Sequence, residues 1–225
     1  MILCYILIEK IRRGEKMKIL KYLLVACMMT MSIFAQETKR IALTFDDGPK
    51  AKITEEILEV LNENNAKATF FILGTNGKRY PKILEKIYDG GHQIANHSYN
   101  HPNLKKLPMN DVKKELESTN KIITSVTNKK VVYFRPPYGA LGKTQKEELK
   151  KSLGMESVMW NICPKDWEKP SDADYIAKFL VENAKDNGIV LLHDYGKTAQ
   201  ALKVAIPELK AKGFEFVTVE ELNKK

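Results

Sequence analysis

The sequence has 225 residues, of which 44% are hydrophobic and 29% are charged, and its formal net charge is +9. This length accommodates one sizeable domain and is short for two, and the chain contains no internal repeat of the kind that builds solenoids or propellers. No cluster of basic residues is interleaved with aromatic residues, so the positive charge does not indicate a nucleic-acid-binding protein.

The first 35 residues differ in composition from the rest of the chain. Lysines precede an apolar run over Tyr22–Ala35, which is too short for a comfortable transmembrane span and is typical of a secretory signal peptide. We therefore expect residues 1–35 to be a leader cleaved after Ala35, or a shorter one starting at Met17, and residues 36–225 to be exported to the periplasm, cell envelope or medium. Cys27 lies in a segment that resembles a lipoprotein box, but most apolar residues follow it, so lipid anchoring is the less favoured interpretation.

Removal of the leader would change the cysteine content and the charge of the chain. Of the three cysteines, Cys4 and Cys27 lie in the leader, together with six Lys or Arg and two Glu. The mature domain would keep only Cys163, so it could form no intrachain disulfide and would depend on its core for stability. It would also stay mildly basic, as suits an anionic wall polymer as partner. We expect a monomer with no transmembrane span.

After the leader, short apolar runs alternate with longer amphipathic segments. Runs rich in Val, Ile and Phe predict seven strands, over Arg40–Phe45, Ala68–Leu73, Gln93–Asn96, Val131–Phe134, Ser157–Trp160, Ile189–Leu192 and Glu215–Val219. Apolar residues at helical spacing predict helices at 53–61, at 83–87, at 112–126 after Pro108, and over Ala173–Lys185 and Ala199–Lys212. Strands separated by single helices imply right-handed crossovers and a parallel sheet.

This alternation predicts an α/β fold, namely a distorted, incomplete (β/α) barrel with about seven parallel strands. An open doubly wound sheet is the alternative. In both architectures the chemistry belongs at the carboxyl ends of the strands. The candidate polar residues all lie there, because Asp46 follows the first predicted strand, His97 the third, Arg135 the fourth and His193 the sixth.

Asp46 and Asp47 are adjacent carboxylates at the end of the first predicted strand. Neighbours along a strand point to opposite faces, but the following Gly48-Pro49 forces a turn that allows both to reach one site. Two like charges held close together are costly unless a cation lies between them. A turn in which Asp caps a backbone N–H is the alternative, and on these residues alone the two interpretations are evenly matched.

His97 and His101 are four residues apart, a separation that places two imidazoles on one face of a helix. Two imidazoles and a carboxylate suit zinc with an open position for water, although Co²⁺, Ni²⁺ or Fe²⁺ would also fit. An isolated pair of histidines would more often be exposed and polar. Beside Asp46 and Asp47 they favour a metal-dependent hydrolase, with one Asp as ligand and the other as base.

The remaining polar candidates have less specific signals. His193 ends an apolar strand and is well placed as a general acid, although a core histidine would give the same pattern. Arg135 could pair with a carboxylate, but a plain surface arginine is the commoner case. Trp167, next to Asp166, could stack on a sugar or simply be packed. His92, in a turn between a helix and a strand, is interpreted as structural.

Five motifs in order resemble the polysaccharide deacetylases with NodB homology, which form carbohydrate esterase family four. They are Thr-Phe-Asp-Asp-Gly-Pro at 44–49, His-Ser-x-x-His at 97–101, Arg-Pro-Pro-Tyr at 135–138, Asp-Trp at 166–167 and Leu-x-His-Asp at 191–194. The resemblance covers the chain from Lys39 to Leu222. It implies a distorted (β/α) barrel that removes acetyl groups from N-acetylated sugars of peptidoglycan or chitin-like oligomers.

The resemblance also implies a role for each matching residue. Those expected to act in catalysis or on the metal are Asp46 as general base, His193 as general acid, Arg135 and Asp166 as the partners that tune them, and Asp47, His97 and His101 as ligands of a divalent metal, usually zinc. Those expected to contact substrate are Tyr138, through its backbone N–H, with Pro137, Leu191 and Trp167. An ionised Asp46 and a protonated His193 would give a bell-shaped pH profile.

One position departs from the family pattern. The fourth motif usually reads Asp-x-x-Asp-Trp, and Cys163 stands at its first position. A local packing variation is favoured there over a redox or metal-binding role. Two alternatives to N-deacetylation remain: an O-deacetylase of the acetylxylan esterase type, which would use the same residues, and a sugar-binding pseudoenzyme, which the intact set of motifs disfavours.

Overall fold

The computed structural model describes residues 38–224. Its strands are β1 (Lys39–Gly48), β2 (Ala68–Ile72), β3 (Gln93–Asn96), β4 (Tyr133–Phe134), β5 (Glu156–Ser157), β6 (Gly188–His193) and β7 (Phe214–Phe216). Its helices are α3 (Ile53–Glu63), α4 (Gly74–Arg79), α5 (Pro81–Asp89), α6 (Met109–Thr127), α7 (Lys143–Leu153), α8 (Ala173–Asn183), α9 (Gly196–Ala211) and α10 (Val219–Asn223), with short 3₁₀ turns at η1 (Leu104–Lys106) and η2 (Pro137–Gly139). The expected leader lies outside the described residues.

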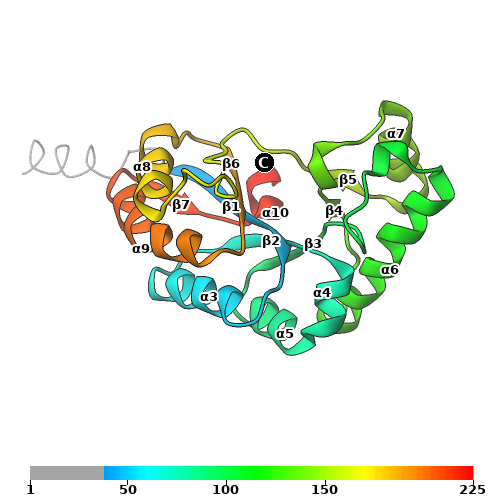
Figure 1. Ribbon diagram of the computed structural model, residues 1–225, viewed down its shortest axis with the longest axis horizontal. Helices are drawn as coiled ribbons and strands as arrows, with labels where there is room; N and C mark the ends of the chain where they lie inside the picture. Colours follow the sequence, from blue (N-terminus) through cyan, green and yellow to red (C-terminus); the bar gives the residue numbers. More distant parts are fainter. Residues whose placement is uncertain (1–37, 225) are drawn as a thin grey trace, which may run out of the picture. The chain divides into compact units, whose positions relative to one another are not determined.

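The seven strands form one curled parallel sheet (Figure 1). Its order is β5-β4-β3-β2-β1-β6, and β7 pairs with the start of β1. After β5, the chain pairs with β6 at one isolated parallel bridge, between Ile162 and Val190. The expected distorted, incomplete barrel is therefore confirmed, and the doubly wound alternative is wrong.

Alternation along the strands separates two apolar regions. On β1, Ile41, Leu43 and Phe45 belong to the main core beneath the surrounding helices. Ala42 belongs to a smaller cluster inside the curl, with Phe71, Ala95, Val158 and Val219 of α10. Figure 1 shows α10 on this inner side of the sheet. By the same alternation Thr44 and Asp46 face inward above the small cluster, so a polar layer lies at the carboxyl end of the sheet.

The ends of some elements differ from the prediction. The strand predicted over Glu215–Val219 ends at Phe216, because Thr218 caps α10 and accepts a hydrogen bond from the Glu221 N–H at 3.1 Å. The sequence did not predict α4, α7 or α10. In α7, Leu149 is the one buried residue, so that helix has almost no apolar stripe for a periodicity argument to detect.

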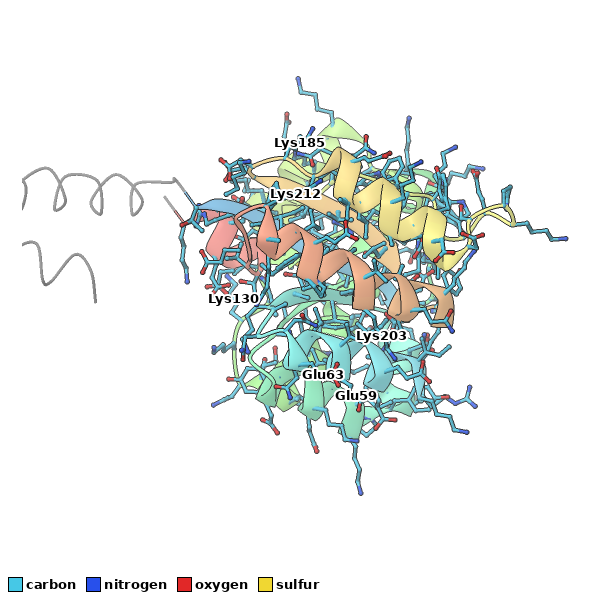
Figure 2. The ribbon with its side chains drawn as sticks, turned by 90° about the vertical axis from the view of Figure 1, so that its left-hand side faces the viewer. Glu59, Glu63, Lys130, Lys185, Lys203 and Lys212 are labelled. Atoms are coloured by element: carbon cyan, nitrogen blue, oxygen red, sulfur yellow. The ribbon has the colours of Figure 1, made fainter. Side chains whose placement is uncertain are left out.

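The outer faces of the helices carry charged side chains. Figure 2 shows Glu59 and Glu63 of α3 and Lys203 of α9 among them, and all three are exposed. These charges lie on solvated helix surfaces, away from the carboxyl ends of the strands. Among residues 38–224, no helix is long and apolar enough to span a membrane.

Candidate metal centre and acid–base groups

A β-bulge brings Asp46 and Asp47 to one site. The pairing of β1 with β2 shifts register between Asp46 and Gly48, so Asp47 is an extra residue in the strand, and its φ is 68°. The bulge reverses the usual alternation at this point. As a result His97 Nε2 lies 3.7 Å from Asp46 Oδ2 and 3.5 Å from Asp47 Oδ1.

The two histidines lie in a loop after β3, so the expectation that they share a helical face is wrong. Ser98 and His101 have φ of 69° and 62°, which breaks any helical turn between them. The side chains of Asn96 and Glu115 hold the loop, accepting hydrogen bonds from the backbone N–H groups of Ser98 at 2.7 Å and of Tyr99 at 2.8 Å. The loop still brings the two imidazole rings to a centroid distance of 5.1 Å.

Asp47, His97 and His101 form a cluster that fits a divalent metal. One ligand atom from each lies within 4.8 Å of the others, and Asp47 Oδ1 is 3.5 Å from His97 Nε2 and 3.4 Å from His101 Nε2. Two ligands of a tetrahedral zinc ion, at bond lengths of about 2.0–2.1 Å, lie about 3.3–3.4 Å apart. Asp47 Oδ1 is buried and makes no hydrogen bond with any described residue, so a cation would give it the partner it lacks.

Burial keeps His97 ready to act as a ligand. Its Nδ1 lies 2.8 Å from the carbonyl oxygen of Arg135, which can only accept, so Nδ1 carries the proton and Nε2 presents its lone pair to Asp47. Burial and the nearby His101 lower the pKa of His97, and the carboxylates of Asp46 and Asp47 only partly oppose this. A neutral imidazole is the form that binds a metal.

Arg135 is fully buried and pairs with Asp46, so the surface interpretation of this arginine is excluded. Its Nη1 donates to Asp46 Oδ1 and to Thr44 Oγ1, each at 2.7 Å. Its Nε donates to the Val158 carbonyl at 3.2 Å, and its guanidinium lies 4.2 Å from the centre of the Phe71 ring. This set of contacts fixes the position of the Asp46 carboxyl group at the top of the inner layer.

His193 lies opposite Asp46, as its partner in the pairing of β1 with β6. Its Nδ1 is 2.8 Å from Asp166 Oδ1, while Asp166 Oδ2 accepts hydrogen bonds from the His193 N–H and from Thr198 Oγ1, both at 2.8 Å. Burial by itself lowers the pKa of His193. The hydrogen bond and charge of Asp166, with the charges of Asp46 and Asp47, outweigh that effect, so the pKa lies above its ordinary value.

Two exposed aromatic rings flank these groups. Tyr138 is 70% exposed and its ring edge lies over His101, with centroids 4.6 Å apart. Trp167 is 45% exposed and packs edge-on against His193 at 5.2 Å, so it is not simply packed in the core. Of the other two residues expected to contact substrate, Leu191 is buried in β6 opposite Thr44, and Pro137 is buried in η2.

Cys163 and His92 lie outside the metal cluster. Cys163 is half-buried, and burial raises the pKa of its thiol, which disfavours the reactive thiolate. His92 is buried against the edge of Phe70, with ring centroids 5.7 Å apart, as expected for a structural residue.

The sequence reasoning missed several residues that support the site. Thr44, Asn96 and Thr198 each bond to a candidate residue or to its loop, as described above. Asn96 is the last residue of β3 and Thr198 lies in the first turn of α9. The position of Asn96 at a strand end and of Thr198 in a first helical turn could have indicated these two residues. The contact of Thr44 with Arg135 spans 91 positions of sequence, so no local pattern indicated Thr44.

Comparisons with known proteins agree with the geometry. The sequence profile of the family described as "Polysaccharide deacetylase" matches residues 35–158. Peptidoglycan-N-acetylglucosamine deacetylase PgdA of Listeria monocytogenes is 39% identical over 189 residues, which are 84% of this chain and 40% of that protein. The chitooligosaccharide deacetylase of Azorhizobium caulinodans is 35% identical over 195 residues, covering 80% of this chain and 92% of that one.

A solved structure has the same fold. Peptidoglycan deacetylase PdaC from Bacillus subtilis superposes with a TM-score of 0.77 at 34% identity, covering 84% of this chain and 91% of that one. The chain thus spans less than half the length of its Listeria relative, and nearly all of the Azorhizobium one.

Proposed function

The chain belongs to the polysaccharide deacetylase family, and we propose that it hydrolyses the acetamide of N-acetylglucosamine units in peptidoglycan or chitin-like oligomers with the help of a bound metal. The observation that carries this proposal is the cluster of Asp47, His97 and His101, with Asp46 and His193 facing each other beside it. Two relatives are named as deacetylases of peptidoglycan N-acetylglucosamine and of chitooligosaccharides, which supports an N-acetylated glycan as the substrate.

Amide hydrolysis needs three kinds of group, and the site offers candidates for each. A divalent cation held by Asp47, His97 and His101 would supply Lewis-acid polarisation of the acetamide carbonyl. The donor set of two imidazoles and one carboxylate suits zinc best. Because an amide carbonyl is a poor electrophile and an amine is a poor leaving group, a base and a separate acid are needed as well.

Asp46 and His193, which face each other across β1 and β6, are the candidates for these two roles. The Arg135 guanidinium, 2.7 Å from Asp46 Oδ1, holds the carboxyl group in place, and in this proposal Asp46 takes a proton from the attacking water. Asp166 raises the pKa of His193, which favours an imidazolium that can give its proton to the leaving amine. In this proposal the backbone N–H of Tyr138 stabilises the oxyanion, Leu191 and Pro137 contact the acetyl group, and Trp167 contacts the sugar.

Export would bring the enzyme to such a substrate. We infer from the signal-peptide pattern of residues 1–35 that the domain works outside the cytoplasm, where peptidoglycan and extracellular glycans are found. The mildly basic charge of the remaining chain is compatible with an anionic cell-wall polymer.

The deciding experiment is acetate release by the purified chain after metal removal and reloading with zinc. Substrates are N-acetylglucosamine oligomers, peptidoglycan and acetylated xylan. We expect zinc-dependent release from the N-acetylated substrates, abolished in Asp46→Asn, which keeps the shape of the side chain but cannot act as base. Release from xylan alone would assign the protein to the O-deacetylases. Sugar binding with no release from any substrate would identify a pseudoenzyme.

A further inference from the structure

Asp194 is a buried carboxyl group for which the proposed reaction has no use. It follows His193 directly and is fully buried, at the point where the backbone pairing of β1 with β6 ends at Asp46 and His193. Its Oδ2 accepts a hydrogen bond from Thr54 Oγ1. The same oxygen lies 2.6 Å from where a Cβ on Gly48 would be, so the carboxyl group packs directly against the backbone that follows Asp47.

Lys50 connects to Asp194 in two ways, indirectly through Thr54 and directly at the backbone carbonyl oxygen of Asp194. Its backbone N–H donates to Thr54 Oγ1 at 2.7 Å, so Thr54 links the backbone after the catalytic turn to Asp194. Its ammonium group donates to the carbonyl oxygen of Asp194 at 3.2 Å and lies 4.5 Å from the centre of the Tyr195 ring. Side-chain hydrogen bonds thus connect the segment after β1 to the end of β6, beyond the last backbone pair of the two strands.

The position of Asp194 is costly, because its Oδ1 is buried and has no hydrogen-bond partner among residues 38–224. Burial raises the pKa of Asp194 to about 6, against the lowering effects of Thr54 and Lys50. Packing alone would be met better by an apolar side chain of similar size. A buried acid retained at such a cost beside a reactive site is typical of a residue kept for function.

We propose that Asp194 is a positioning residue that, through Thr54 and Lys50, clamps the turn bearing Asp46 and Asp47 against the end of β6. The clamp sets the separation of the base and the metal ligand on one strand from the acid on the other. It acts without touching substrate, and it rests on the proposed function for the roles of Asp46, Asp47 and His193.

The test uses Thr54, because Thr54→Val removes the linking hydroxyl at nearly constant volume and Thr54→Ser keeps it. We measure kcat and KM for acetate release, zinc affinity by competition with a chromogenic chelator, and the melting temperature. Thr54→Val should lower kcat about tenfold with KM within about twofold, and should weaken zinc binding about tenfold, because Asp47 loses its fixed position. Thr54→Ser should keep kcat and zinc affinity within about threefold of wild type.

Thr127→Val is the matched control. Thr127 is also buried and bonded to backbone, to the Ile123 carbonyl at 3.0 Å, but it lies at the end of α6, outside the site. It should leave kcat and zinc affinity unchanged. If Thr54→Val has wild-type kcat and zinc affinity, the clamp is refuted and Asp194 is only structural.

A variant that does not fold, or a wild type without activity, would still allow a test of the clamp. If Thr54→Val does not fold, Thr54→Ala removes the same hydroxyl and with it the link between Lys50 and Asp194, and unchanged zinc affinity and kcat in that variant would refute the proposal. If the wild type releases no acetate from any substrate, the proposed function fails, while the zinc competition still decides whether the clamp holds Asp47.

Discussion

Replacing Asp166 by Asn should move the alkaline limb of the pH profile to lower pH. Asp166 Oδ1 lies 2.8 Å from His193 Nδ1, and the aspartate's charge and hydrogen bond raise the pKa of His193. Asn keeps the size and the hydrogen bonds to the His193 N–H and Thr198, but it removes the negative charge. The pKa of His193 should therefore fall, and the acid should lose its proton at lower pH.

The size of the effect follows from this geometry. An opposite charge at this distance shifts a pKa by about 1–3 units, which is about 1.4–4 kcal/mol in favour of the protonated imidazole. Above both pKa values, the protonated fraction of His193 should fall about 10- to 1000-fold in the variant. At low pH, where both proteins hold the proton, the two rates should converge.

The assay is kcat/KM for acetate release as a function of pH, since this ratio reports the ionisations of the free enzyme. Thr198→Val is the control, because it removes the third hydrogen bond to Asp166 but leaves its charge, and its alkaline limb should stay in place. A uniform loss of rate in Asp166→Asn, with the alkaline limb unmoved, would refute the assignment of Asp166 as the group that raises the pKa of His193.

Three further predictions concern buried charges. Arg135→Met should lower the free energy of unfolding by about 3–5 kcal/mol in denaturant titrations, because it leaves Asp46 buried and unpaired; an unchanged midpoint would contradict this. Burial and the charge of Lys67 lower the pKa of His92 to about 4. The free energy of unfolding should therefore fall by about 3 kcal/mol as the pH falls from 6.5 towards 4. His92→Leu should make the free energy of unfolding less dependent on pH over this range. Burial raises the pKa of Asp194 to about 6, so the charged carboxylate destabilises the fold as the pH rises from 4 to 6. Over that range the free energy of unfolding of Asp194→Asn should rise by about 3 kcal/mol relative to wild type. Parallel plots of unfolding free energy against pH for the two proteins would contradict this.

The barrel was predictable because its signals are local. Each of the seven strands overlaps an apolar run that can be read from the sequence, with ends that differ by up to three residues. Every pair between the strands is parallel, as helical crossover connections require. The boundaries were less accurate where capping decided them, as at Thr218, whose side chain begins a helix inside a predicted strand. Helices with little apolar surface, such as α7, leave no periodic pattern to find.

The candidate site was predictable in its members but not in its geometry. Asp46, Asp47, His97 and His193 were identified as strand-end polar residues and His101 by its spacing from His97, and the structure brings them together. The reason given for His97 and His101 was nevertheless wrong, since a loop with left-handed residues, not a helix, brings their rings together. Spacing in sequence cannot distinguish the two, because both conformations can bring residues i and i+4 close.

The sequence by itself determined the strand pattern, the parallel connections and the identity of the groups placed at the carboxyl ends of the strands, because each depends on residue type and on contacts within a few positions. Only the tertiary structure decided the bulge at Asp47, the burial of Arg135 against Asp46, and the Asp194 clamp across β1 and β6. These features join residues that lie far apart in the chain, and their formation depends on the register and curl of the whole sheet, which no local pattern encodes.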